Sequence, residues 1–332
     1  MIVENKKIKA SVMLADQSLE MAWDEALEKI QEHKACRLDD ATDKPHIGWA
    51  SGNCELITDV TAENSVVADR YLDLTMRITV RKPQASMVRA LLRKKIAEYK
   101  KENGVSFLSG KIRRELKQEV LDYILPSTIP TVKSVWVVLD KCDGQKCRIY
   151  SGAVTESDKS ALAMLIYETF KMDVKPLSLN DILFTHGVQE LDGNEDLCFL
   201  TDLYFSHEAG ETVVPPVYLV DPEKEQKAVK ISVSGVEAMD SAEVRAAFAQ
   251  NKKCSKLCMI VSGEAVPGIW DERDGWQFTL DRSGNFTGLA LPETEEIEPN
   301  AVFGDRMRMI GCLFEWLEEK YAQFAGKISV GG

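Results

Sequence analysis

The sequence predicts an α+β protein with several mixed or antiparallel sheets, packed helices and a basic helical arm. Residues 72–80 alternate apolar and polar side chains with a strict period of two, which is typical of a half-buried strand. Residues 157–171 instead carry apolar side chains at helical spacing. Segments of both kinds interleave along the 332 residues without the regular spacing of βαβ units, and this favours the α+β class.

The first half of the chain is expected to be rich in strands. Apolar periodicity predicts strands over 8–14, 45–52, 72–80, 135–140 and 147–150, and helices over 19–30 and 157–171. Asp143-Gly144 is typical of a hairpin turn, so it should join the last two of these strands.

The second half of the sequence also predicts both strands and helices, from weaker apolar periodicity. It predicts strands over 197–205, 229–233, 257–261, 276–280 and 286–291, and helices over 241–250 and 301–324. Residues 209–226, which contain Pro215-Pro216, are expected to be a connection with a short strand in it. Residues 293–300 form an acidic loop, and the tail GKISVGG at 326–332 is expected to be loose.

These elements group into three regions, and a chain of this length can hold two or three packed units. Residues 1–81 together with 134–208 are expected to form an α+β core region. Residues 82–133 form what we call the basic arm, and 209–332 form a second α+β region that ends in a long helix.

Positive charge is concentrated around the basic arm. Between residues 81 and 117 the chain has 12 Lys and Arg but only 3 Glu. The whole protein has 41 basic and 53 acidic side chains, a net charge of -12, so the rest of the chain carries 29 basic against 50 acidic side chains. A face with so little internal compensation repels itself unless an anion is near.

Two helices are expected within the basic arm. The first ends at Asn103-Gly104, and the second begins near Ser109 and ends before Pro126 and Pro130. Apolar stripes at helical spacing comprise Val88, Leu91, Leu92, Ile96 and Tyr99 in the first helix and Ile112, Leu116, Val120 and Tyr123 in the second. These stripes should pack while the basic faces look outward.

A basic helical face has more than one interpretation. Charge runs are often solvated faces supported by Glu–Lys pairs, but few such pairs exist here. Nucleic-acid backbone is one partner for this face, and lipid headgroups or an acidic protein are others.

Recognisable signatures of catalysis and cofactor binding are absent from the sequence, so we expect no cofactor, no bound metal and no catalytic residue. Neither GxxxxGK[ST] nor GxGxxG occurs, and no HExxH is present. The pairs Cys142/Cys147 and Cys254/Cys258 lack the spacing of a zinc site. Asp271, Glu272 and Asp274 are more simply part of an acidic surface than a metal cluster of a nuclease.

The chain is expected to be cytoplasmic and to have no membrane span. It contains no run of about 18 apolar residues, and its N-terminus lacks the features of a secretory signal. The 8 cysteines are scattered, which favours free, packed thiols over a disulfide framework.

Several segments resemble the RdgC-like, recombination-associated bacterial proteins. The match begins with HIGW at 46–49 and is strongest over RELKQEV at 114–120 and ILP at 124–126. It continues in the same order through Trp136, Asp140, Gly144, 161–170 and Pro176-Leu177, and then through 199–201, 276–280 and Leu291-Pro292. The chain departs from the family at 127–129, where Ser-Thr-Ile stands in place of an Arg and an aromatic residue.

The resemblance implies a ring-shaped homodimer that encircles double-stranded DNA without reading its sequence, each chain forming half of the ring. Members of the family are nucleoid-associated and restrain recombinase filaments in homologous recombination, and some carry an exonuclease label. We therefore expect phosphate contacts from the basic arm, namely from Arg89, Arg93, Lys94, Lys100, Lys101, Lys111, Arg113, Arg114 and Lys117. The alternatives are a metal-dependent DNA exonuclease and a protein-interaction module with an acidic partner.

Overall fold

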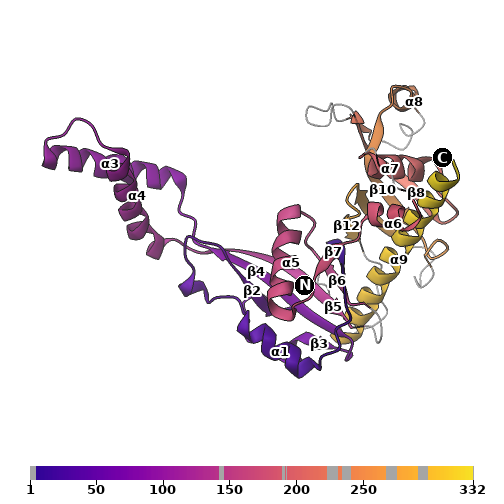
Figure 1. The fold of residues 1–332 in the computed structure, drawn as a ribbon, viewed down its shortest axis with the longest axis horizontal. Helices are drawn as coiled ribbons and strands as arrows, with labels where there is room; N and C mark the ends of the chain where they lie inside the picture. The colour runs from indigo at the N-terminus through magenta and orange to yellow at the C-terminus, as the bar shows by residue number, and fades with distance from the viewer. Residues whose placement is uncertain are drawn as a thin grey trace.

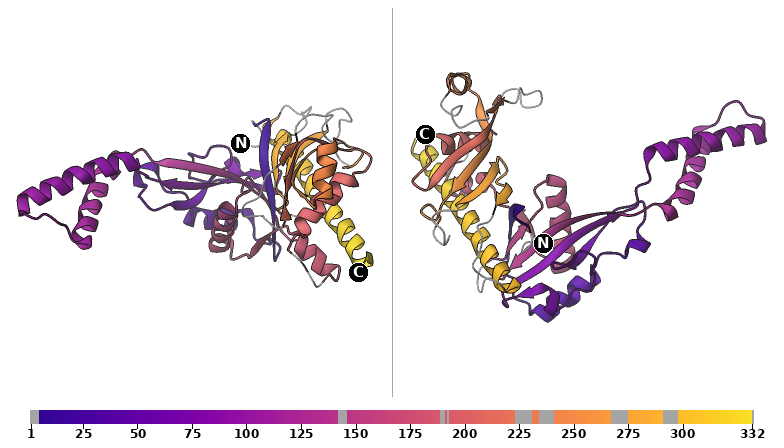
Figure 2. Two further views of the ribbon diagram at one scale, coloured as in Figure 1. Left: turned by 90° about the horizontal axis from the view of Figure 1, so that it is seen from above. Right: turned by 180° about the vertical axis from the view of Figure 1, so that it is seen from behind.

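The computed structural model describes residues 5–141, 146–188, 191, 193–222, 231–233, 241–266, 275–290 and 298–331. The molecule is elongated and curved (Figures 1 and 2). Two helices, α3 (Ala85–Asn103) and α4 (Gly110–Ile124), extend from one end of a central group of long strands. A second group of strands, covered by helices, lies at the other end.

The strands follow one another in a single hydrogen-bonded order. This order is β2 (His46–Ser51), β4 (Tyr71–Val80), β5 (Thr131–Asp140), β6 (Arg148–Ser151), β1 (Lys7–Ala15), β12 (Phe286–Ala290), β11 (Trp276–Asp281), β10 (Lys253–Val261), β8 (Glu211–Val220) and β9 (Ile231–Val233). Two short strands, β3 (Val66–Val67) and β7 (Val174–Pro176), pair with β4 and β1. All of these pairs are antiparallel, which together with the helices confirms the predicted α+β class.

β1 is the strand that joins the two groups. Its first part pairs with β12, with Lys7 opposite Ala290, and its second part pairs with β6, with Ser11 opposite Ser151. The pairing with β12 shifts register between Ile8 and Ala10, and the strand passes to the other group between Ala10 and Ser11. The two groups are therefore linked by backbone hydrogen bonds of a single strand as well as by side-chain packing.

The strand group β2-β4-β5-β6 packs against α1 (Trp23–Glu32) and α5 (Glu156–Phe170), with the short α2 (Ala62–Ser65) nearby. Trp49 of β2 is fully buried, and its Nε1 donates to Thr169 Oγ1 of α5 at 2.8 Å. A buried indole N–H needs such a partner. This bond fixes α5 against the strand layer.

The second group packs against α6 (Leu179–Thr185), α7 (Glu195–Phe205), α8 (Ala242–Ala249) and the long α9 (Pro299–Gly331). Phe286 of β12 and Phe314 of α9 are fully buried with ring centroids 4.9 Å apart. The domain division expected from the sequence groups residues up to 208 with the first region, whereas α7 lies on β10 and against α9.

β4 differs from the half-buried strand that its alternation predicts. Its polar residues Asp73, Thr75, Arg77 and Thr79 are as buried as the apolar residues between them. Burial raises the pKa of Asp73 from 3.8 to about 7. Alternation identified the strand correctly but gave no sign that both of its faces are covered.

Residues 197–205 were expected to form a strand, and that prediction is wrong because they lie within α7. A short apolar run does not distinguish a strand from a buried helix. Here the helix is favoured by Glu195 and Asp196 in its first turn and by packing on β10, where Thr201 Oγ1 accepts a hydrogen bond from Cys254 N at 2.9 Å.

Two further expectations need correction. Residues 211–220, expected to be mostly a connection, form the ten-residue strand β8. The strand tolerates Pro215 and Pro216 because they fall where its register with β10 shifts between Leu257 and Cys258. The tail expected to be loose continues α9 to Gly331, and Ser329 Oγ donates to Ala325 O at 2.9 Å and His186 O at 3.2 Å.

Other expected elements have the predicted type with shifted ends. In α5 the sequence predicts a buried face with Ala161, Met164, Leu165 and Thr169. Leu165 and Thr169 are buried as expected, whereas Met164 is exposed. Cys254 and Cys258 are both buried within β10 as free thiols.

The described residues do not include some segments for which the sequence made predictions. These are Cys142, the Asp143-Gly144 turn, 271–274 and most of the acidic loop 293–300. No helix in the described ranges has the length and hydropathy that a bilayer span requires.

Candidate nucleic-acid interface

The basic arm is an insertion between two paired strands. β4 ends at Val80 and β5 begins at Thr131, and these two residues face each other in the antiparallel ladder. The chain thus leaves and re-enters the sheet at one point. Figures 1 and 2 show α3 and α4 reaching from this point away from the rest of the molecule.

Arg81, the first residue after β4, organises this point. Its guanidinium donates to six carbonyl oxygens at 2.8–3.3 Å, which belong to Leu38, Asp39, Ala41, Leu125, Pro126 and Thr128. The first three lie in and beside the 3₁₀ turn η1 (Leu38–Asp40), and the last three lie in and beside η2 (Leu125–Ser127). Because a guanidinium has five N–H donors in a fixed plane, one side chain ties the outgoing strand, the returning chain and a loop of the core together.

Local signals set the ends of the two helices as expected. Gly104 has a left-handed φ of 65°, which glycine adopts without strain, and its N–H bonds Lys100 O at the end of α3. Ser109 Oγ accepts from Ile112 N and caps the start of α4.

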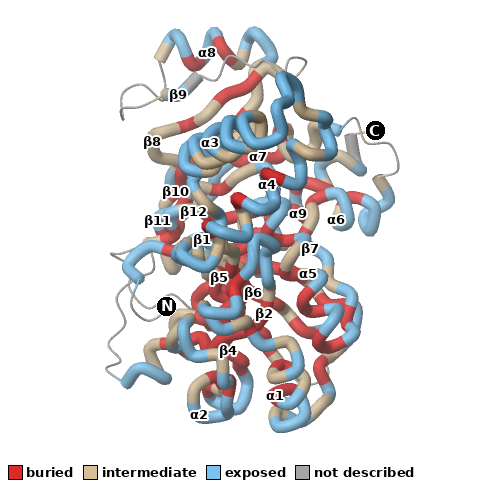
Figure 3. Tube along the Cα trace, turned by 90° about the vertical axis from the view of Figure 1, so that its left-hand side faces the viewer, coloured by how far each residue is buried: buried red, intermediate tan, exposed pale blue. Residues whose placement is uncertain are grey.

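The helices of the basic arm have a small core. α4 buries Leu116, Val120 and Ile124, but α3 buries none of its residues completely. Figure 3, with the arm toward the viewer, shows α3 only in the intermediate and exposed colours. In α4 the expected stripe is buried at Leu116 and Val120 and half-buried at Ile112, but it is exposed at Tyr123. The expected stripe of α3 is half-buried along its length. An ion pair between Lys95 and Glu119 also links the two helices.

The nine basic residues expected to contact phosphate all lie on α3 and α4. Eight of them are exposed and Lys100 is half-buried. Their contacts are local, as in Arg89 Nε to Ala85 O at 3.1 Å and Lys94 Nζ to Glu98 Oε1 at 3.9 Å. The arrangement leaves most of these cations facing solvent on one projecting structure, where an extended anion can reach them.

Large apolar side chains are exposed on the same arm. Phe107 in the α3–α4 loop is 92% exposed, Tyr123 is 79% exposed, and Ile129 after η2 is 86% exposed. Tyr123 was expected to pack inside the arm, but the helix turns it outward. Isolated exposed apolar residues are common, whereas three on one arm suggest a surface that another molecule covers.

Sequence reasoning missed the roles of Arg81 and Lys95, since both were counted only as positive charge. Lys95 lies on the apolar side of α3, and that position could have revealed its contact with α4. Arg81 could have been suspected from its place at the end of a strand and ahead of Pro83. Its six acceptors, however, come from segments far apart in the sequence, and only the folded chain brings them together.

A metal centre is the other candidate chemistry that can be followed in the described part of the chain. Within it, no group of three or more His, Cys, Asp and Glu side chains is placed to hold a metal ion. Glu208, next to His207, accepts a hydrogen bond at its Oε2 from Lys320 Nζ of α9 at 2.7 Å, and this contact lowers the pKa of the Glu208 carboxyl. It therefore has a structural partner.

Comparison with known proteins does not assign the chain to a family. No family model matches the chain, and no characterised protein matches it in sequence.

Replacing Arg81 with Met should loosen the basic arm at its base. Hydrogen bonds from a charged donor contribute about 1.5–3 kcal/mol each, and the substitution would leave six carbonyls to water or to no partner. We expect amide hydrogen exchange in η2 and the adjoining turns of α3 and α4 to be about 10- to 100-fold faster. Lys82→Met, an equal charge change at an exposed neighbour, is the control. Equal exchange in both variants would show that other interactions hold the arm.

Proposed function

We propose that this protein binds double-stranded DNA without sequence specificity, as a ring-shaped homodimer that modulates recombinase-driven homologous recombination in the nucleoid. The observation that carries the proposal is the projecting pair of helices with nine phosphate-contact candidates, eight of them exposed. The family resemblance, with its expected antagonism of recombinase filaments, supplies the biological setting.

Electrostatics supports phosphate as the partner. Lysine and arginine side chains that neutralise phosphates release condensed counterions, and this favours binding to any sequence. Phosphate contacts fix position and carry no base information. Because the rest of the chain is acidic, nucleic acid would be directed to the basic arm and kept away from the remaining surface.

The shape of the chain is compatible with half of a ring. Figure 1 shows a curved molecule with the basic arm at one end and the β8–β10 strands with their helices at the other. Two such copies meeting at their ends would enclose an opening. The exposed apolar side chains of the arm, Phe107, Tyr123 and Ile129, are the surface that a second copy would cover.

The DNA-binding role of the arm can be tested by replacing Lys94, Lys100, Arg113 and Lys117 with Gln. If a dimer neutralises about six to ten phosphates, affinity should fall about 10³- to 10⁵-fold between 50 and 200 mM salt. The quadruple variant should bind all duplex sequences more weakly and show a flatter salt slope, by about one unit for each phosphate that the protein no longer neutralises. Fluorescence anisotropy at several salt concentrations measures both quantities.

The matched control replaces four exposed cations outside the arm, Lys44, Lys175, Arg245 and Lys256, with Gln. It changes the net charge equally, so it should keep most of the affinity and the wild-type slope. Equal binding by both quadruple variants would place the DNA contact elsewhere. Failure of the wild type to bind duplex would contradict the proposed function.

The homodimer can be tested by sedimentation velocity at micromolar concentration. We expect the wild type to sediment as a dimer. Ile129→Asp should shift it toward monomer, because a carboxylate would be buried in an apolar contact. Leu56→Asp, at an exposed side chain outside the arm, is the control and should remain dimeric. A wild-type monomer that stays monomeric with DNA would contradict the ring, and a dimeric Ile129→Asp variant would remove the arm from the interface.

A further inference from the structure

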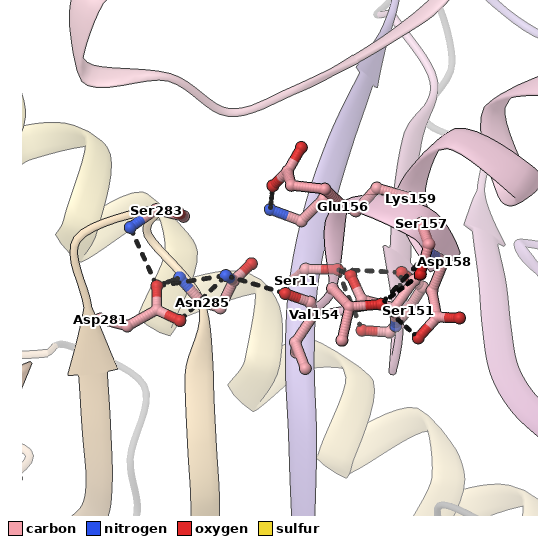
Figure 4. A network of polar contacts seen from close by, with 12 residues as sticks. Ser11, Ser151, Val154, Glu156, Ser157, Asp158, Lys159, Asp281, Ser283 and Asn285 are labelled. Atoms are coloured by element: carbon pink, nitrogen blue, oxygen red, sulfur yellow. Dashed lines mark hydrogen bonds and ion pairs between the residues drawn. The ribbon is translucent and has the colours of Figure 1, made fainter. Parts of the chain in front are cut away.

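A polar cavity of about 250 Å³ lies where the two strand groups meet. Its lining comes from the start of α5, the β7–α6 connection, the start of α7, the β11–β12 turn and α9. Figure 4 shows Glu156 and Lys159 extending from α5 toward the turn that carries Ser283. Below them, Asn285 Nδ2 bridges Asp281 and Val154 O across the junction at 3.1 and 3.4 Å.

Two deeply buried polar side chains line this cavity. Tyr321 of α9 is 2% exposed, and its hydroxyl has no hydrogen-bond partner among the described residues. Lys159 is 5% exposed, and its ammonium has one ion pair, at 3.8 Å, with Glu156, whose side chain is 82% exposed. Both side chains are largely buried and line the cavity, so a further hydrogen-bond acceptor there would stabilise both polar groups.

The surroundings favour an anionic acceptor. The cavity touches the N-terminal turns of α5 and α7, which have 15 and 11 residues, and helix N-termini carry partial positive charge. Arg282 adds a second cationic side chain at the rim, where it is half-exposed. Ser178, Asn180 and Ser283 can donate further hydrogen bonds.

The carboxylates at the cavity are engaged in other contacts. Glu195 accepts from Gly193 N at 3.0 and 3.3 Å, and Asp196 accepts from Leu197 N at 2.9 Å while facing Arg282 at 3.7 Å. Glu156 lies in solvent at the rim, where it can move aside. These acids thus belong to the first turns of their helices and leave Lys159 and Tyr321 available to a ligand.

We propose that this cavity binds a phosphoryl group, with Lys159 as its counter-charge and the Tyr321 hydroxyl as a hydrogen-bond donor. The volume suits inorganic phosphate or the phosphate end of a nucleoside monophosphate. The site is far along the chain from the basic arm and does not depend on the DNA-binding proposal.

Isothermal titration calorimetry with inorganic phosphate and with dAMP, at constant ionic strength set by NaCl, tests the site on the full chain. We expect saturable binding of at least one of these two probes. Tyr321→Phe removes a single hydroxyl and should weaken binding about 2- to 12-fold. Lys159→Met removes the buried charge and should weaken it by about tenfold or more. Arg245→Gln, at an exposed cation elsewhere, should leave binding unchanged.

Tighter binding of dAMP than of phosphate would identify a nucleotide site, and equal binding would identify a site for the phosphoryl group alone. The proposal is overturned if neither probe binds at millimolar concentration. It is equally overturned if the Tyr321→Phe variant, folded by circular dichroism, binds as tightly as the wild type. Loss of binding in Arg245→Gln to the same extent would show general charge attraction and no built site.

Discussion

The six carbonyl contacts of Arg81 are the constraint on which the geometry of the basic arm depends. The arm has a small core of its own, since only Leu116, Val120 and Ile124 are buried among the residues of its two helices. Such a structure cannot fix its direction by its own packing. The side chain of Arg81, together with the β4–β5 ladder, is therefore the main link between the base of the arm and the core.

The direction of the arm matters because basic side chains are concentrated on it while the rest of the chain is acidic. Cations that are close together on α3 and α4 repel one another, and contacts such as Lys95–Glu119 offset this only in part. The remaining repulsion is relieved when phosphates approach. The rest of the chain carries 29 basic against 50 acidic side chains, so its surface would repel the same phosphates.

The sequence was informative where local pattern decides structure and silent where distant segments converge. Alternation identified β4, and glycine and serine signals placed the ends of α3 and α4, because these features depend on neighbouring residues. The segment 197–205 was misassigned because its helix is favoured by packing on β10. Pro215-Pro216 suggested a loop, since a bulge that accommodates prolines within a strand has no local signature. The cavity beside Lys159 and Tyr321 and the acceptors of Arg81 arise only from the tertiary fold.

We propose that duplex DNA lies against the basic arm, and position-specific photo-crosslinking detects this contact directly. A benzophenone side chain at Ala97, exposed on α3, should crosslink to labelled duplex of any sequence. The same group at Ala249, exposed at the end of α8, serves as the reference. We expect crosslinks at Ala97 that disappear as salt is raised, and few at Ala249. Crosslinks at Ala249 with none at Ala97 would contradict the proposed contact.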